Sequence, residues 1–220
     1  MNNEHIDPEL KEQAKQAADN SDVDLRELVR DITIQALTEQ QLDSEGTKRV
    51  IHSVIGGIAE GLEKQKGTLE VSLKTALKGV DDALGKTAQA SKLAIEEVYG
   101  KTSDFAENDL KNAIQDLTSL EDLFIDSINV VSRQTNHLVR TVLTDLAVHF
   151  QNSGTEVRRQ TLSAATGLRQ ELMTAGRESV TSAVDTGKQM SQQLAGIASG
   201  ILAGMAETLS KKAKSSTSEK

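Results

Sequence analysis

The chain has no cysteine, no tryptophan, a single proline and few other aromatic residues. Of its 220 residues, three are Phe and one is Tyr. Without cysteine there can be no disulfide, no thiol chemistry and no cysteine-ligated metal, and the composition fits a reducing compartment. Because large aromatic side chains dominate most cores, any core here must be built from Leu, Ile, Val and Ala. With only Pro8 to interrupt them, long helices are allowed.

Charge is unevenly spread along the chain, whose formal net charge is −8. Residues 1–43 hold 11 acidic and 4 basic residues, whereas residues 153–220 hold 6 and 9. An acidic chain without base-stacking aromatics is a poor candidate for nucleic-acid binding. Residues 1–7 show neither the basic nor the apolar region of a secretory signal, so we expect a cytoplasmic protein.

The strongest pattern is an apolar residue at every eleventh position from residue 51 onward. Eleven residues make three turns at about 3.67 residues per turn, close to the natural α-helical period, so one apolar stripe can run far with little supercoiling. The pattern predicts a single amphipathic helix over residues 47–99. Its stripe contains two rows with this spacing. One row is Ile51, Leu62, Leu73, Leu84 and Ile95, and the other is Ile58, Leu69 and Val80.

Two breaks divide the rest of the chain into long segments. Gly100 is placed as a helix C-cap, and Thr102, Ser103 and Asp104 can supply the next N-cap, so we expect the chain to reverse there. A weaker break lies at residues 152–155. Between the breaks, apolar residues repeat every seven positions, the spacing of a helix-packing seam, at Leu110, Leu117, Phe124, Val131 and Leu138.

The N-terminal region contains start signals for two shorter helices. Asp7 followed by Pro8 is an N-cap with proline at the first helical position. Ser21 with Asp24 three residues later resembles a capping box and predicts a second helix that reaches about Gln41.

These segments predict an all-α protein. We expect an elongated antiparallel bundle of about three long amphipathic helices with a short N-terminal helical hairpin. The expected parts are a helical hairpin at 1–43, a long helical hairpin at 44–151, an Ala/Gly/Ser-rich amphipathic helix at 152–210 and a disordered tail at 211–220.

Two arrays of glycines spaced four residues apart predict close helix packing. Glycine costs about 1 kcal/mol inside a helix, so several on one face imply a compensating gain, usually the near approach of another helix. The stretch around the second array has too few consecutive apolar residues to span a membrane, for which about 20 are needed. The glycines are Gly57, Gly61, Gly196, Gly200 and Gly204.

The titratable residues show no arrangement typical of catalysis or metal binding. None of the four histidines lies three or four residues from another, so there is no helical metal pair. Adjacent acids such as Asp81 and Asp82 point about 100° apart on a helix, and we interpret them as solvated faces. Gly56 and Gly57 lack the lysine of a phosphate-binding loop. We expect no enzyme activity, no cofactor and no metal.

In composition the chain resembles the phasins, small helical proteins that coat polyhydroxyalkanoate granules in bacteria. The resemblance rests on the lack of cysteine and proline, the Leu/Ala stripes and a back half rich in Ala, Gly, Ser, Thr and Gln, and it is strongest over residues 155–209. It implies amphipathic helices that adsorb to a hydrophobic granule, self-association and no enzymatic activity. It assigns no individual functional residue.

Two functional hypotheses follow. In the first, the stripes bind an extended hydrophobic surface, a storage granule or a lipid interface, and the cytoplasmic protein associates with a granule or membrane surface. In the second, the stripes pair with helices of other chains in a homo-oligomeric coiled-coil scaffold or a helical partner-binding protein. We expect a homo-oligomer that neither spans a membrane nor binds nucleic acid.

Overall fold

A computed structural model shows an all-helical protein. It describes residues 6–19, 24–39, 44–65, 67–101 and 107–178, and no strand occurs within these ranges. The all-α class predicted from the sequence is confirmed. In chain order the helices are α1 (Pro8–Asp19), α2 (Leu25–Glu39), α3 (Ser44–Leu62), α4 (Leu69–Lys101), α5 (Glu107–Gln134), α6 (His137–Ser153) and α7 (Glu156–Glu178).

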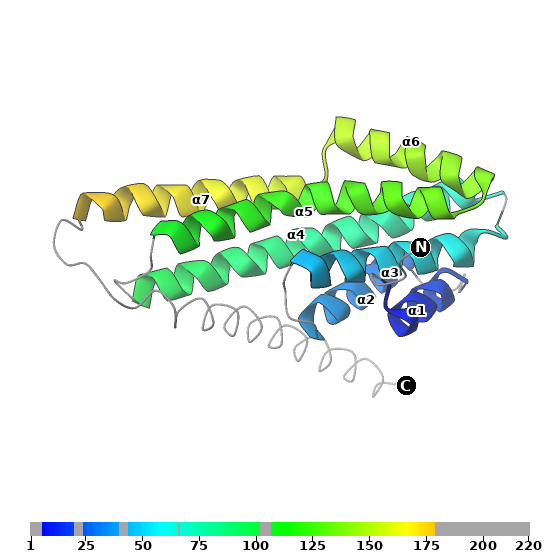
Figure 1. Cartoon of the computed structure of the whole chain (residues 1–220), viewed down its shortest axis with the longest axis horizontal. Coiled ribbons are helices and arrows are strands. Elements are labelled where there is room, and N and C mark those ends of the chain that lie inside the picture. Colours follow the sequence, from blue (N-terminus) through cyan, green and yellow to red (C-terminus); the bar gives the residue numbers. More distant parts are fainter. Residues whose placement is uncertain (1–5, 20–23, 40–43, 66, 102–106, 179–220) are drawn as a thin grey trace.

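The helices form an elongated bundle around α4. Helices α4, α5 and α7 run along its length, with α4 and α5 in opposite directions, and α3 lies at one end (Figure 1). Helix α1 packs mainly on α3, and α2 packs mainly on α4. Helix α4 also contacts α7 extensively. The two N-terminal helices are therefore held by the longer helices more than by each other.

The prediction of one continuous helix over residues 47–99 is wrong. Helix α3 ends at Leu62 and α4 begins at Leu69. In the turn between them, the N–H of Gln65 donates to the Leu62 carbonyl at 3.0 Å, and the N–H of Thr68 donates to the Gln65 carbonyl at 3.3 Å. The apolar spacing continues across this turn because Leu62 and Leu69 are both buried in the same core. Periodicity alone could not reveal the break.

The long segment expected between the two breaks, residues 103–151, is also divided into two helices, α5 and α6. Helix α6 begins after Asn136, whose side-chain Oδ1 accepts a hydrogen bond from the N–H of Val139 at 3.0 Å. We name this turn between α5 and α6 the α5–α6 elbow. The side chain of Arg140 stabilises it. A helix leaves its last carbonyls without internal partners, and the Arg140 guanidinium donates to the carbonyls of Ser132, Arg133 and Thr135 at the end of α5.

Two predicted boundaries are confirmed. The carboxylate of Asp7 accepts hydrogen bonds at 3.0 and 3.1 Å from the two N–H groups that follow Pro8, so Asp7 is the N-cap of α1. The break at residues 152–155 is present, because α6 ends at Ser153 and is capped by Gly154, which has a φ of 78°. Glycine adopts a positive φ at little cost, whereas other residues rarely do.

Two other boundaries are displaced. Asp24 is itself the N-cap of α2, because its carboxylate accepts hydrogen bonds from the N–H groups two and three residues ahead. The predicted capping box, with Asp24 already inside the helix, is therefore wrong, and Ser21 lies outside the described residues. Gly100 lies within α4, which continues to Lys101. The predicted tail and the later part of the predicted helix at 152–210 fall outside the described ranges.

Glycines lie at three of the main helix contacts. A Cβ added to Gly57 or Gly61 of α3 would lie 2.1 or 2.6 Å from a backbone carbonyl oxygen of α1. A Cβ at Gly79 of α4 would lie 2.5 Å from the carbonyl oxygen of Arg26 in α2. A Cβ at Gly85 of α4 would lie 3.0 Å from the side chain of Glu156 in α7. At the first three positions, a larger residue would force the two backbones apart.

Gly57 and its neighbour Gly56 provide a matched test of this close approach. We expect Gly57→Ala to lower the free energy of unfolding by about 2 kcal/mol, because α1 must move away. At Gly56 the nearest atom to an added Cβ is the Lys11 Cε at 3.7 Å, an ordinary contact. Gly56→Ala should leave stability unchanged or raise it by up to about 1 kcal/mol through better helix propensity. Urea unfolding followed by circular dichroism measures both variants, and equal stabilities would contradict the close packing.

Candidate functional site

The apolar stripe predicted from the sequence lies inside the bundle. Its described members on α3, α4 and α5 are between 0% and 5% exposed. Leu138, at the start of α6, differs because it is 46% exposed. Ile95 and Leu110 are helical, but their side chains are outside the part of the chain whose side chains are described. The buried members are Ile51, Ile58, Leu62, Leu69, Leu73, Val80, Leu84, Leu117, Phe124 and Val131.

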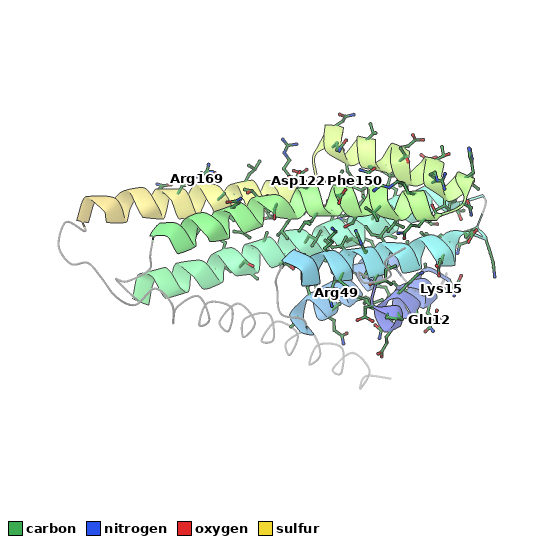
Figure 2. The ribbon with its side chains drawn as sticks, viewed as in Figure 1. Glu12, Lys15, Arg49, Asp122, Phe150 and Arg169 are labelled. Atoms are coloured by element: carbon green, nitrogen blue, oxygen red, sulfur yellow. The ribbon has the colours of Figure 1, made fainter. Side chains whose placement is uncertain are left out.

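An aromatic contact ties α6 to this interior. The ring of Phe150 in α6, which is labelled in Figure 2, meets the ring of Phe124 in α5 edge to face, with centroids 5.4 Å apart. Such pairs contribute about 0.5–1.5 kcal/mol beyond the area they bury. The remaining described core is aliphatic, in agreement with the composition.

A buried carboxylate from α4 caps the N-terminus of α7. The two oxygens of Asp81 accept hydrogen bonds from the N–H groups of Glu156 at 2.7 Å and Val157 at 2.9 Å. The Thr155 hydroxyl accepts from the N–H of Arg158 at 3.0 Å. A helix leaves these first N–H groups without internal partners, and the positive end of its dipole favours a negative charge. Asp81 therefore anchors α7 to α4.

Charged side chains around Asp81 extend this junction to α2. Burial raises the pKa of Asp81 from 3.8 to about 6, its two N–H donors oppose the rise, and the charges of Asp82 and Glu156 add to it. Asp82 holds Arg26 of α2 through two hydrogen bonds of 2.6 and 2.9 Å, which raise the pKa of the guanidinium. The hydrogen bond from Arg159 lowers the pKa of the Glu156 carboxyl. Opposite charges thus connect α2 with α4 beside the start of α7.

The same end of α7 is joined to α5. The Thr155 hydroxyl donates to a carboxylate oxygen of Glu121 at 2.9 Å, and the guanidinium of Arg158 lies 3.6 Å from the other oxygen. We name the contacts of Asp81, Asp82, Glu121, Thr155 and Arg158 the α7 junction. It brings four helices together where α7 begins.

The interpretation of the adjacent acids as solvated faces is wrong for Asp81, which is 6% exposed. The two side chains do diverge, because Asp81 faces α7 and Asp82 faces Arg26 of α2. No local signal marks Asp81, since its hydrogen-bond donors are 75 and 76 residues further along the chain.

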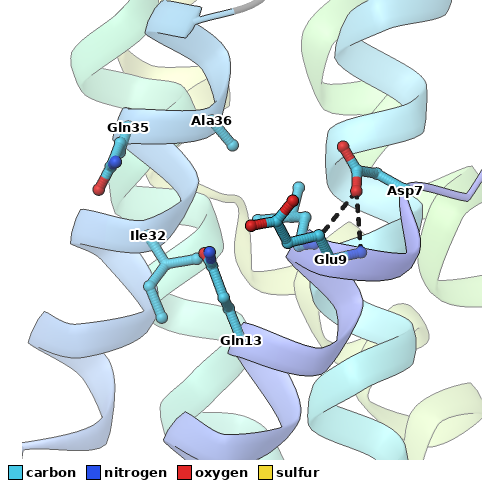
Figure 3. A pocket seen from close by; sticks show the side chains of 7 residues that line it. Asp7, Glu9, Gln13, Ile32, Gln35 and Ala36 are labelled. Atoms are coloured by element: carbon cyan, nitrogen blue, oxygen red, sulfur yellow. Dashed lines mark hydrogen bonds between the residues drawn. The ribbon is translucent and has the colours of Figure 1, made fainter.

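Two cavities lie between the N-terminal helices and their neighbours, and several of their polar side chains are engaged with one another. A small one of about 140 Å³ lies between α1 and α2, where the carboxylate of Asp7 is engaged in capping α1 (Figure 3). A larger groove of about 430 Å³ lies between α1, α3 and the α5–α6 elbow. On its rim Lys11 pairs with Glu60, and the Asn136 amide donates to Glu63 at 2.5 Å. Within the described ranges, no group of three His, Cys, Asp or Glu side chains could hold a metal ion.

Of the two predicted glycine arrays, only the first lies within the described residues. Gly57 and Gly61 lie directly against α1. Gly196, Gly200 and Gly204 lie outside the described residues. None of the helices within the described residues has the length and apolarity to cross a membrane. Gly79 and Gly85 were missed because they are single glycines, although a glycine inside a long helix is itself a packing signal.

The fold and its contacts define an all-α protein in which helices close around a shared aliphatic core. The chain belongs to DUF6781, a family of unknown function, whose family model matches residues 1–211. No curated protein and no solved structure matches it.

The pKa of Asp81 predicts a specific pH dependence of stability. The folded protein binds the Asp81 proton more tightly than the unfolded chain does, because the pKa is about 6 instead of 3.8. The stabilisation from this proton is complete below pH 3.8 and is lost as the pH rises through 6. We expect the free energy of unfolding of wild type, relative to Asp81→Asn, to fall across this window by at most about 1.4 kcal/mol per pH unit.

Above about pH 7 the difference should stay level, because Asp81 is then ionised in both states. Denaturant titrations at several pH values measure it, and Asp122→Asn, at an exposed carboxylate of α5, is the control. A wild-type minus Asp81→Asn difference that is independent of pH would contradict the buried carboxylate.

Proposed function

We propose that this is a non-enzymatic, cytoplasmic helical protein that binds an extended hydrophobic surface, as the resemblance to the phasins implies. The observation that carries the proposal is the set of apolar residues at regular spacing on α3, α4 and α5, whose described members are buried within one chain. Burial of apolar area is favourable whether the area meets another helix or an apolar surface. The same stripe could therefore close the bundle in water and cover a storage granule or lipid interface once the helices separate.

The buried polar side chains support such a separation. Among the buried hydroxyls of the described residues, those of Thr33, Thr87 and Ser127 donate to a backbone carbonyl four residues earlier in their own helix, at 2.7, 3.0 and 2.6 Å. A buried polar group that loses its partner costs about 1–3 kcal/mol. Because each partner carbonyl is in the same helix, these hydrogen bonds would remain if the helices separated. These hydroxyls therefore add no desolvation cost to the separation of the helices.

The polar contacts between helices are concentrated at a few junctions. Besides the α7 junction, Lys11 of α1 pairs with Glu60 of α3, and the N–H of Asp7 donates to the buried Ser53 hydroxyl of α3 at 2.7 Å. In the turn after α3, the Gln65 amide donates to the Ala18 carbonyl of α1 at 3.3 Å, and Glu63 accepts from the Asn136 amide at 2.5 Å. A partly exposed ion pair such as that of Lys11 and Glu60 contributes little, about 0–1 kcal/mol, and a typical hydrogen bond contributes about 0.5–1.5 kcal/mol. If the helices separated on an apolar surface, contacts between helices would thus be replaced by contacts with that surface, and few polar contacts would be lost.

A disulfide between α4 and α7 tests whether binding requires opening. An added Cβ at Gly85 would lie 3.4 Å from the Cγ of Gln160, whose place a cysteine sulfur would take, so Gly85→Cys with Gln160→Cys is within reach of disulfide geometry. Oxidation should keep α4 covered and weaken binding to hydrophobic polyester particles at least about tenfold, because burying even one large apolar side chain is worth that much. Co-sedimentation measures the binding.

The control is Gly85→Cys with Leu162→Cys, since Leu162 is 54% exposed on the outer side of α7. Its binding should not respond to oxidation, and reduction should restore binding of the stapled variant. Equal binding of the stapled variant before and after reduction would show that the stripe is not used.

A homo-oligomeric scaffold or helical partner-binding protein is the second candidate. The observation in its favour is a set of exposed large apolar side chains that self-association could cover: Val71, Leu93, Leu138, Val148 and Leu162. The stripe itself needs no second chain, because its described members on α3, α4 and α5 are already buried.

Light scattering and circular dichroism in plain buffer and in detergent separate the two candidates. For the surface-binding function we expect helix–helix contacts to loosen in detergent, with loss of cooperative unfolding and a gain of helix. A stable oligomer that unfolds cooperatively and gains no helix in detergent would favour the scaffold instead.

A further inference from the structure

A groove between α2, α4 and α7 gathers positive charge on a chain that is acidic overall. Its volume is about 330 Å³, which lies within the range of about 300–1,000 Å³ found for small-molecule sites. Four basic and two acidic side chains line it, whereas the whole chain has a formal net charge of −8. The basic side chains are Arg26 and Arg30 of α2, Lys86 of α4 and Arg159 of α7.

Helical spacing brings faces of all three helices to this groove. Residues three and four apart lie on the same face of a helix, and the lining residues of each helix follow that spacing. The hydrogen bond from Arg159 is the main cause that lowers the pKa of the Glu156 carboxyl, and the charge of Arg26 also lowers it. Basic side chains of α2 and α7 therefore act on one carboxylate. The lining residues of α4 are Asp82, Gly85, Lys86 and Gln89.

The basic side chains of the groove keep hydrogen-bond donors that the neighbouring carboxylates do not use. An arginine has five N–H groups on its guanidinium. Arg26 donates to Asp82 from Nε and from Nη2, and Arg159 donates to Glu156 from one Nη atom. Within the described part of the chain, Lys86 has no hydrogen-bond or ion-pair partner. Each of the three helices thus supplies positive charge with donors to spare.

We propose that this groove binds a small molecule through a di- or triphosphate group. A guanidinium pairs with phosphate oxygens through two parallel hydrogen bonds, and a lysine adds a compact charge. Because four cations face only two carboxylates, a ligand with two or more negative charges balances the groove. Among the described residues that line it, none is aromatic and able to stack on a nucleobase, so the phosphate groups are the part that is recognised.

Such a ligand would connect α2, α4 and α7 and stabilise the closed bundle. A ligand that binds only the folded state adds stability that grows with its concentration. This inference goes beyond the proposed function and does not depend on it, because it concerns the closed form of the protein in water.

Lys86→Gln and Lys78→Gln are a matched pair that tests the groove. Both lysines are exposed on α4, and of the two only Lys86 lines the groove. Isothermal titration calorimetry of the full chain with inorganic pyrophosphate, at constant ionic strength, measures the affinity. We expect Lys86→Gln to weaken binding at least about tenfold, because a hydrogen bond between charged groups is worth that much, and Lys78→Gln to bind as wild type does.

Gln89 allows a second test, in which the charge is changed at one position. Its side chain is exposed and lines the groove, so both substitutions should leave the melting temperature without ligand unchanged. Gln89→Lys should tighten pyrophosphate binding and Gln89→Glu should weaken it, each by up to about fivefold, as expected for partly exposed charges.

Inorganic oligophosphates and phosphorylated metabolites share this chemistry, and adenosine diphosphate separates the two sources. We expect pyrophosphate to bind at least as tightly as adenosine diphosphate. Tighter binding of adenosine diphosphate that is lost in Lys86→Gln would also support the site, and it would identify a phosphorylated metabolite as the ligand.

Two outcomes would overturn the inference. One is that millimolar pyrophosphate gives neither a heat of binding nor a rise in the melting temperature of wild type. The other is that Lys86→Gln and Lys78→Gln weaken binding equally, which would show attraction to the chain as a whole instead of to the groove. The proposed function is tested separately, because these variants leave the buried stripe unchanged.

Discussion

The bundle depends on the close approach of helix backbones at glycines. Helices usually pack with their axes about 8–10 Å apart, at a distance set by the side chains between them. Here α1 lies against Gly57 and Gly61 of α3, α2 lies against Gly79 of α4, and α7 contacts Gly85. A core with few aromatic side chains has little bulk to fill wide gaps, so these contacts let small aliphatic side chains reach native packing density.

Polar contacts decide how the helices are joined at their ends. Asp81 satisfies the first N–H groups of α7, and Arg140 satisfies carbonyls at the end of α5. Both pairings link groups that a helix cannot satisfy internally. Deeper in the bundle, buried hydroxyls such as that of Thr87 bond within their own helix. The interior thus supplies apolar area, while the junctions specify which helix ends meet.

The apolar interior and the polar junctions would respond differently to an apolar surface. Apolar contacts are non-directional and can be exchanged for contacts with another apolar phase, whereas the α7 junction has defined partners and geometry. Stability in water and adsorption to a surface would draw on the same stripe and would therefore compete.

The sequence by itself determined the helical class, the apolar stripe, the N-cap at Asp7 and the break at Gly154, because these follow from local periodicity and local backbone chemistry. Periodicity did not reveal the turn after Leu62, since the helices on both sides of it face one core and the apolar spacing continues, nor the turn after Gln134, where the seven-residue spacing leads to the exposed Leu138. Nor could it show that Asp81 is buried, or that the stripe is covered within one chain. Those features depend on contacts between residues distant in sequence, which only the tertiary structure brings together.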